Sequence, residues 1–212
     1  MSSASADASR RTCLLCRSKR WRGVLAVFAV VAVLGIGAWA DREWLLRSAT
    51  DLWIVSDPIG PADAVAVFGG GIEDRPFAAA EYYRQGLVKR VLVSNGVVIS
   101  DVVANEGVLL KLGVPANAIE VFGNDLTNTH QEVLALRAWA GRNNARSIIV
   151  PTEIFSARRV RWMLHRAFGG ECLIRVIALD PGNDRNDWWR HMQGVTAFKT
   201  EVIKYLYYIL RY

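Results

Sequence analysis

The feature that most constrains the fold is an alternation of short apolar runs and helix-like segments, which begins at Asp63 and continues to the end of the chain. The apolar runs are rich in Val and Ile, and helical patterns of about ten residues separate them. A glycine stands near the end of each helical pattern between two runs, where helices usually stop. We therefore expect βαβ units and an α/β fold, with a doubly wound, mostly parallel, five-stranded, Rossmann-like sheet.

The bounds of the expected elements follow from the same patterns. The expected strands are 64–68, 90–94, 119–122, 147–150 and 173–179. The expected helices are 76–85, 102–112, 129–141 and 155–168, with a final one at about 196–210.

A glycine-rich turn follows the first expected strand. The strand stops at Gly69, Gly70 and Gly71, and Pro76 then occupies a position favoured at the start of a helix. Glycines leave backbone N–H groups open to a ligand, and a helix N-terminus adds partial positive charge. Together with Arg75, these features favour an anion site. The alternative is a turn that only allows the strand and the helix to pack.

Further candidates for ligand binding follow the other expected strands, because ligands of doubly wound sheets bind at strand carboxyl ends. They are Ser94, Asn95, Gly96, Asn128, Thr129, Thr152 and Arg158. A guanidinium in the first turn of a helix gains nothing from the helix dipole, so Arg158 predicts an anionic partner. Thr129 and Glu132 also fit a capping box, and Asn128 fits a turn, so helix capping remains an alternative to ligand contact.

Two carboxylates are candidates for a general base, with water as the nucleophile, if the protein catalyses a reaction. Glu106 interrupts the apolar pattern of its helix, where it either pairs with Arg75 or contacts a ligand hydroxyl. Glu132 belongs to the polar segment after the third strand. Whether a reaction is catalysed is left open by the sequence.

Motifs of common enzyme classes are missing from the sequence. There is no G-x-S-x-G, H-E-x-x-H or Walker pattern, and no G-x-G-x-x-G for a dinucleotide. We therefore expect no cofactor. The three histidines are scattered, so no metal site is expected either: His130, His165 and His191.

An uncharged segment from Gly23 to Ala40 just reaches the length of a membrane-spanning helix, and Trp21 and Trp39 flank it like interfacial anchors. Basic residues precede it, which by the positive-inside rule places the N-terminus in the cytoplasm and the domain in the periplasm. The expected location is thus the bacterial inner membrane, with a single pass. A cleaved signal peptide and a buried core helix are the alternatives.

The chain is divided on this basis into four parts: a disordered basic tail at 1–20, a transmembrane anchor at 21–40, a membrane-proximal linker at 41–62 and the Rossmann-like domain at 63–212. The linker is expected either to lie on the bilayer or to pack on the domain. The aromatic and basic residues near the C-terminus suit either a bilayer interface or a helix packed on the sheet.

The positive net charge of +6 belongs to the tail rather than to the domain. Six of the 26 Lys and Arg residues precede Gly23, against one of the 20 acidic residues. The remaining chain is nearly neutral, so no nucleic-acid-binding face is expected.

These motifs, in their order and spacing, resemble those of the YdcF/SanA/ElyC type of bacterial envelope proteins. The matching features are Gly69–Gly71 with Arg75, Ser94–Gly96, Thr127–Glu132 and Thr152–Arg158. The resemblance covers the chain from about Asp63 onward and implies a Rossmann-like domain tethered to the inner membrane. It departs at Phe155, where family members commonly have a His three residues before the arginine that Arg158 matches.

The resemblance implies a role in envelope biogenesis, such as peptidoglycan biosynthesis. We expect a membrane-anchored protein that binds a phosphorylated ligand, such as a polyprenyl-phosphate-linked one, at the strand carboxyl ends. The expected partners are the lipid bilayer and envelope-assembly proteins. The alternative, favoured by the missing family His, is a non-enzymatic envelope scaffold with a vestigial pocket.

Overall fold

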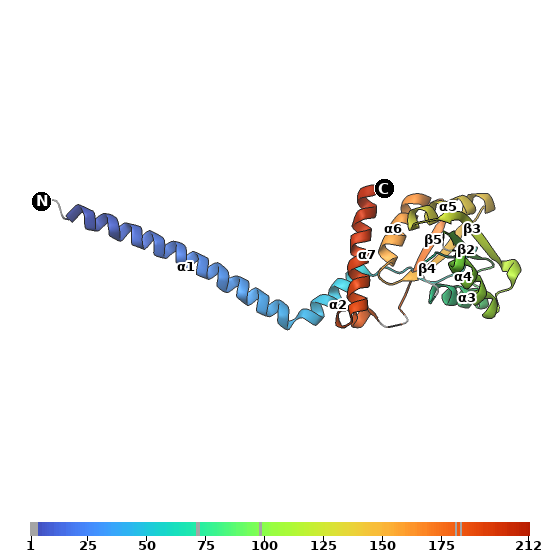
Figure 1. The fold of residues 1–212 in the computed structure, drawn as a ribbon, viewed down its shortest axis with the longest axis horizontal. Coiled ribbons are helices and arrows are strands. Elements are labelled where there is room, and N and C mark those ends of the chain that lie inside the picture. The colour runs from blue at the N-terminus through green and yellow to red at the C-terminus, as the bar shows by residue number, and fades with distance from the viewer. Residues whose placement is uncertain (1–3, 71–72, 98, 181, 183) are drawn as a thin grey trace. The chain divides into compact units, whose positions relative to one another are not determined.

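The computed structural model describes residues 4–70, 73–97, 99–180, 182 and 184–212 (Figure 1). The chain divides into two compact units, Met1–Ser48 and Ala49–Tyr212. The second unit begins before residue 63, so part of the segment that the sequence assigned to a linker belongs with the domain.

The first unit contains the helix α1 (Ala4–Ala40). Its part Trp21–Ala40, 20 residues with none of the window buried, is long and apolar enough to cross a membrane or to serve as a signal sequence. The lack of burial argues against a core helix. Residues 4–20 are helical where the sequence predicted disorder. No Gly or Pro interrupts the chain there, and Ala, Arg, Leu and Lys favour helices.

The second unit is built on a five-stranded parallel sheet with the order β3-β2-β1-β4-β5. The strands are β1 (Ala64–Val67), β2 (Val91–Gly96), β3 (Ile119–Leu126), β4 (Ser147–Glu153) and β5 (Leu173–Leu179). The helix α2 (Arg42–Trp53) crosses the boundary between the two units. The other α-helices of the second unit are α3 (Arg75–Arg84), α4 (Ile99–Lys111), α5 (Thr129–Asn143), α6 (Ala157–Phe168) and α7 (Met192–Arg211). Short 3₁₀ helices are η1 (Ala116–Ala118), η2 (Asp184–Asn186) and η3 (Trp188–Arg190). The predicted α/β, doubly wound fold is confirmed.

Two hydrophobic cores lie on the two faces of the sheet, because successive strand residues point to opposite sides. Ala64 and Ala66 of β1 pack with residues of α5 and α6, whereas Val65 and Val67 pack with residues of α3 and α4. The helices before and after β3 therefore cover different faces. The crossovers separate at the boundary between β1 and β4, and there an open sheet leaves a crevice outside its carboxyl ends.

The N-terminal part of the second unit lies along the edge strand β5. The Asp57 N–H donates to the Val176 carbonyl at 2.8 Å, and the Val176 N–H donates to the Asp57 carboxylate at 2.9 Å. The Trp53 indole N–H donates to the Phe155 carbonyl at 2.9 Å. The Thr50 hydroxyl accepts a hydrogen bond from the Trp188 indole at 2.6 Å, and the Ala62 N–H donates to the Leu87 carbonyl at 2.8 Å. The expected linker thus packs on the domain from Thr50 to Ala62.

The helix ends differ from expectation at α5. Gly141 was expected to stop this helix, but the helix continues to Asn143 and Asn144 caps it in the left-handed conformation, with φ 51°. Asn tolerates this region better than most residues. At α6 the expected stop at Gly169 is confirmed, with φ 55°.

Gly194 and Gly141 provide a matched test of the packing of α7. A Cβ atom at Gly194 would lie 2.6 Å from the Trp188 carbonyl oxygen, whereas one at Gly141 would meet no atom within 4 Å. We expect Gly194→Ala to destabilise the protein by about 2 kcal/mol and Gly141→Ala to stabilise it by about 0.5–1 kcal/mol. Thermal unfolding of the detergent-solubilised protein measures both. Equal Tm values for the two variants would contradict the tight contact between α7 and η3.

Candidate functional site

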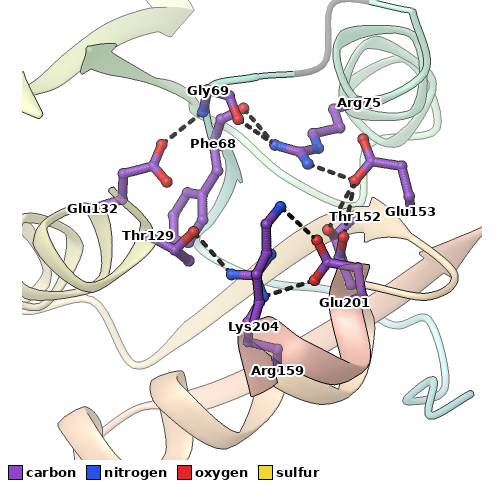
Figure 2. Close-up of polar contacts among 11 residues, drawn as sticks. Phe68, Gly69, Arg75, Thr129, Glu132, Thr152, Glu153, Arg159, Glu201 and Lys204 are labelled. Atoms are coloured by element: carbon purple, nitrogen blue, oxygen red, sulfur yellow. Dashed lines mark hydrogen bonds and ion pairs between the residues drawn. The ribbon is translucent and has the colours of Figure 1, made fainter. Parts of the chain in front are cut away.

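The candidate site lies in the crevice at the carboxyl ends of β1 and β4, where the turn after β1 meets α3, α5, α6 and α7 (Figure 2). Two adjoining cavities occupy it. The first, of about 230 Å³, is named the Arg75 cavity and is lined by Phe68, Gly69, Gly70, Arg75, Thr129, Glu132, Thr152, Glu153, Ser156, Arg159, Val160, Glu201 and Lys204. The second, of about 280 Å³, is named the Ser94 cavity and is lined by Gly69, Gly70, Ser94, Gly96, Val97, Asp101, Leu126, Thr127, Asn128, Thr129 and Glu132.

The Arg75 guanidinium joins the turn after β1 to the end of β4. Its Nη1 donates to the Phe68 carbonyl at 3.0 Å and to the Gly69 carbonyl at 2.6 Å. Its Nη2 donates to the Glu153 carboxylate at 2.5 Å. Its Nε is buried and has no hydrogen-bond partner among the described residues. Arg75 therefore holds the glycine turn in place and retains one unused donor.

Glu132 reaches the same turn from α5. Its Oε1 accepts hydrogen bonds from the Gly69 N–H at 2.6 Å and from the Ser94 hydroxyl at 2.8 Å. The N–H of Gly69 is therefore directed at an internal carboxylate. Burial raises the pKa of Glu132, although the Gly69 and Ser94 hydrogen bonds and the Arg75 charge act in the opposite direction. A buried carboxyl whose pKa is raised is suited to exchange a proton.

A second charged cluster lines the Arg75 cavity from α6 and α7 (Figure 2). The Arg159 Nε donates to the Glu201 carboxylate at 2.7 Å, and its Nη1 donates to the Thr129 hydroxyl at 2.9 Å. Lys204 donates to Glu201 at 2.9 Å. The side chains of Arg159 and Glu201 are 7% and 9% exposed, so this ion pair is almost fully withdrawn from water.

The two acidic partners of these cations, Glu153 and Glu201, differ from Glu132 in the direction of their pKa shifts. Burial opposes ionisation of Glu153, but the Arg75 charge and hydrogen bond outweigh it and lower the pKa. Burial likewise opposes ionisation of Glu201, but Arg159 and Lys204 outweigh it and lower the pKa. The site therefore contains two carboxylates whose pKa is lowered and one whose pKa is raised.

The crevice brings together most of the residues that the sequence predicted. The Arg75 cavity includes Gly69, Gly70, Arg75, Thr129, Glu132 and Thr152, and the Ser94 cavity adds Ser94, Gly96 and Asn128. Gly71 lies outside the described residues.

Three predicted residues line neither cavity. Asn95 donates a hydrogen bond to the Asn124 side chain at 3.3 Å. Glu106 lies in α4 and does not pair with Arg75, whose carboxylate partner is Glu153. The third is Arg158.

The anion-binding role predicted for Arg158 is not supported by its position. Its Nε donates to the Trp53 carbonyl at 2.9 Å, its Nη2 contacts the Leu52 carbonyl, and its guanidinium lies 5.5 Å from the Trp53 ring centroid. Arg159, the next residue, points into the cavity instead. Consecutive helix positions differ by about 100° around the axis, so only one of two adjacent arginines can face the crevice.

The capping alternatives of α5 have a clear outcome. Asn128 is the N-cap, and its side chain accepts a hydrogen bond from the Gln131 N–H at 3.1 Å. Thr129 and Glu132 do not form a capping box, since the Thr129 hydroxyl accepts from Arg159 and Glu132 binds Gly69 and Ser94.

Phe155 belongs to an aromatic cluster. It is 3% exposed, and its ring packs edge-to-face against Trp188 and Phe198. Phe155 lines neither of the two cavities.

Sequence reasoning missed Arg159, Glu153, Glu201 and Lys204 as members of the site. The sequence analysis favoured the neighbouring Arg158 over Arg159, and Glu201 belongs to a helix far along the chain. The signal that could have identified Glu201 is that it is the only acidic residue of α7 and lies among apolar residues.

Other features of the domain offer less chemistry. A cavity of about 500 Å³ is lined in part by Arg137, Phe168 and Glu171, but it lies by the amino-terminal ends of β4 and β5. Among the described residues, no group of three or more His, Cys, Asp or Glu is arranged to hold a metal ion.

Comparison with known proteins adds a single observation. No protein-family model and no curated protein matches the chain. The crystal structure of an aureusimine biosynthetic cluster reductase domain matches it with 12% sequence identity and a TM-score of 0.31. The match covers 66% of this chain and 56% of that chain.

Arg159 and Arg158 provide a paired test of which arginine faces the site. We expect Arg159→Met to lower the free energy of unfolding by about 3 kcal/mol, because it leaves the buried Glu201 without its main partner. Arg158→Met should cost about 1 kcal/mol, since it removes hydrogen bonds to carbonyl groups that are only partly buried. Denaturant unfolding measures both, and a larger loss for Arg158→Met would contradict the placement.

The raised pKa of Glu132 predicts a pH-dependent stability. The folded protein binds this proton more tightly than the unfolded chain does, so the contribution is fully present below the unfolded pKa and is lost as pH rises through the folded pKa. Glu132→Gln removes the ionisation. The Tm of the variant should therefore equal that of the original protein near pH 4 and exceed it by about 2–4 °C at pH 7. Glu171→Gln, at an exposed carboxylate, is the control, and a constant Tm difference across pH for Glu132→Gln would disprove the assignment.

Proposed function

We propose that this protein is a membrane-anchored protein of the bacterial envelope that binds a phosphorylated, lipid-linked ligand in the crevice between β1 and β4. The proposed ligand class is a polyprenyl phosphate or a glycan linked to one, and the proposed location of the domain is the periplasm. The membership in the YdcF/SanA/ElyC type is part of the proposal and depends on the sequence motifs.

The observation that carries the proposal is that three cations from three helices line one cavity: Arg75 of α3, Arg159 of α6 and Lys204 of α7. Cations from separate crossovers at the switch point of a parallel sheet suit an anionic ligand. Each cation holds a carboxylate, so a phosphate would bind by exchange with Glu153 and Glu201. The unused Nε of Arg75 offers a further donor.

The neighbouring Ser94 cavity would hold the uncharged part of the ligand's head group. Ser94 and Asn128 supply a hydroxyl and an amide, and Gly96 leaves the backbone accessible. If bound ligand reacts, Glu132 is the carboxylate placed to exchange a proton with it, since it lines both cavities and its pKa is raised.

A second candidate function is a non-enzymatic envelope scaffold with a vestigial pocket. The observation that favours it is Phe155, which replaces the family His and is used for aromatic packing. Under this alternative, the ion pairs of Arg75 and Arg159 are structural and no ligand displaces them.

A charge-removal experiment distinguishes these functions. Full-length protein in detergent is titrated with a long-chain polyprenyl phosphate, and bound ligand is counted by native mass spectrometry. Lys204→Gln should weaken binding about fivefold, equivalent to about 1 kcal/mol, because one cavity cation is lost. The Lys204 side chain is 50% exposed, so its replacement should leave the fold intact.

Lys111→Gln, at an exposed lysine of α4, is the matched control and should bind like the original protein. The corresponding prenol, which lacks phosphate, should bind weakly and equally to all three proteins. Absence of polyprenyl phosphate binding, or the same affinity for both variants, would favour the scaffold.

A further inference from the structure

The C-terminal helix α7 has an apolar face that is exposed to solvent. Ile203, Leu206 and Leu210 are 60%, 54% and 87% exposed, and Met192 at the start of the helix is 80% exposed. Because each residue turns the helix by about 100°, these positions share one side of it. The buried residues Glu201 and Tyr208, with Gly194, lie on the opposite side. The exposed apolar side chains are concentrated between Ile203 and Leu210, and Met192 lies on the same side at the start of the helix.

The exposed charges of α7 are all basic. Lys199, Lys204 and Arg211 are exposed, and Lys199 lies on the same side of the helix as Ile203 and Leu206. Glu201, the only acidic residue of α7, is buried and bonded to Arg159 and Lys204. Lys204 is thus paired with Glu201, whereas Lys199 and Arg211 add exposed positive charge to a helix surface that also exposes apolar side chains.

Inside the second unit, α7 packs on the part of the chain that follows the apolar helix. The Trp53 ring packs edge-to-face on Phe198 and Tyr205 of α7, with ring centroids 5.6 and 5.5 Å apart. Trp53 follows Ala40, the last residue of the candidate span, by on the order of a dozen residues, which reach at most about 45 Å when fully extended. If the span is in a bilayer, this tether keeps Trp53, and the part of α7 that packs on it, within about 45 Å of that bilayer.

We propose that the exposed face of α7 docks on the anionic surface of the bilayer in which the protein is anchored. An amphipathic helix with a cationic, apolar exposed face is the form that lies in a membrane interface. This inference depends on the membrane anchor of the proposed function but not on its ligand. It assigns to the protein a second membrane contact, made by the domain itself.

A second copy of the chain is a poorer occupant of this face than a lipid surface. A symmetric dimer through α7 would bring the same patch of both copies together. Lys199 and Arg211 would then face cations of the other copy, which opposes association. Anionic lipid head groups match these charges instead.

Photo-crosslinking tests the docking in the full-length protein. Benzoylphenylalanine replaces Leu206 or Leu210 in protein reconstituted into nanodiscs of phosphatidylcholine and phosphatidylglycerol. The control position is Leu110 of α4, which is 49% exposed and lies on a helix of the other sheet face. After irradiation, mass spectrometry should find at least about fivefold more phospholipid adduct at 206 and 210 than at 110. Omitting phosphatidylglycerol should lower the adduct yield at 206 and 210.

Three results would overturn the inference. Lipid adduct at 206 and 210 no higher than at 110 would show that the face lies in water. Covalent dimers from 206 or 210 would identify a second copy as the occupant. Failure of the protein to copurify with nanodiscs would remove the membrane anchor itself, whereas loss of polyprenyl phosphate binding alone would leave the docking intact.

Discussion

The crevice depends on the buried guanidinium of Arg75 more than on any other group. A buried cation needs acceptors, and Arg75 obtains them from the Phe68 and Gly69 carbonyls and from Glu153. On the other side of the same turn, the Glu132 carboxylate accepts a hydrogen bond from the Gly69 N–H. The turn is thus held by a cation on its carbonyl groups and by a carboxylate on its N–H, and it joins the ends of β1 and β4 at the point where the crossovers separate.

Local sequence patterns predicted the fold because they are set by backbone geometry and burial. The Val-rich β1, buried on both sides, needs no information from distant residues, and the glycine turn and Pro76 follow directly from the chain geometry. The bounds of the strands were less predictable where the backbone departs from regular strand geometry. β3 continues to Leu126 through Gly123 and Asp125, both at positive φ, which the sequence pattern did not reveal.

The polar partnerships of the site could not be predicted in the same way. Sequence placed an arginine in the first turn of α6, but the choice between Arg158 and Arg159 depends on how the helix is rotated against its neighbours. Glu132 and Thr129 fit a local capping rule, yet both side chains form hydrogen bonds with residues distant in the sequence instead. Glu201 enters the site only through the packing of α7, more than forty positions after Arg159. Local rules identify residue types at the right edge of the sheet, and tertiary packing decides their partners.

Through the ion pair of Arg159 and Glu201, α7 would take part in the ligand binding that we propose for the crevice. An anion that binds the Arg159 Nε would displace Glu201, which then keeps Lys204 as its remaining partner. The cost of leaving a buried carboxylate with fewer partners opposes such binding, unless α7 shifts and exposes Glu201 to water. Ligand binding in the cavity and the position of α7 would then be thermodynamically linked, and each would affect the other to the same extent. If α7 docks on a bilayer with its exposed face, as we propose, then its buried face, which carries Glu201, would connect membrane contact to access of the crevice.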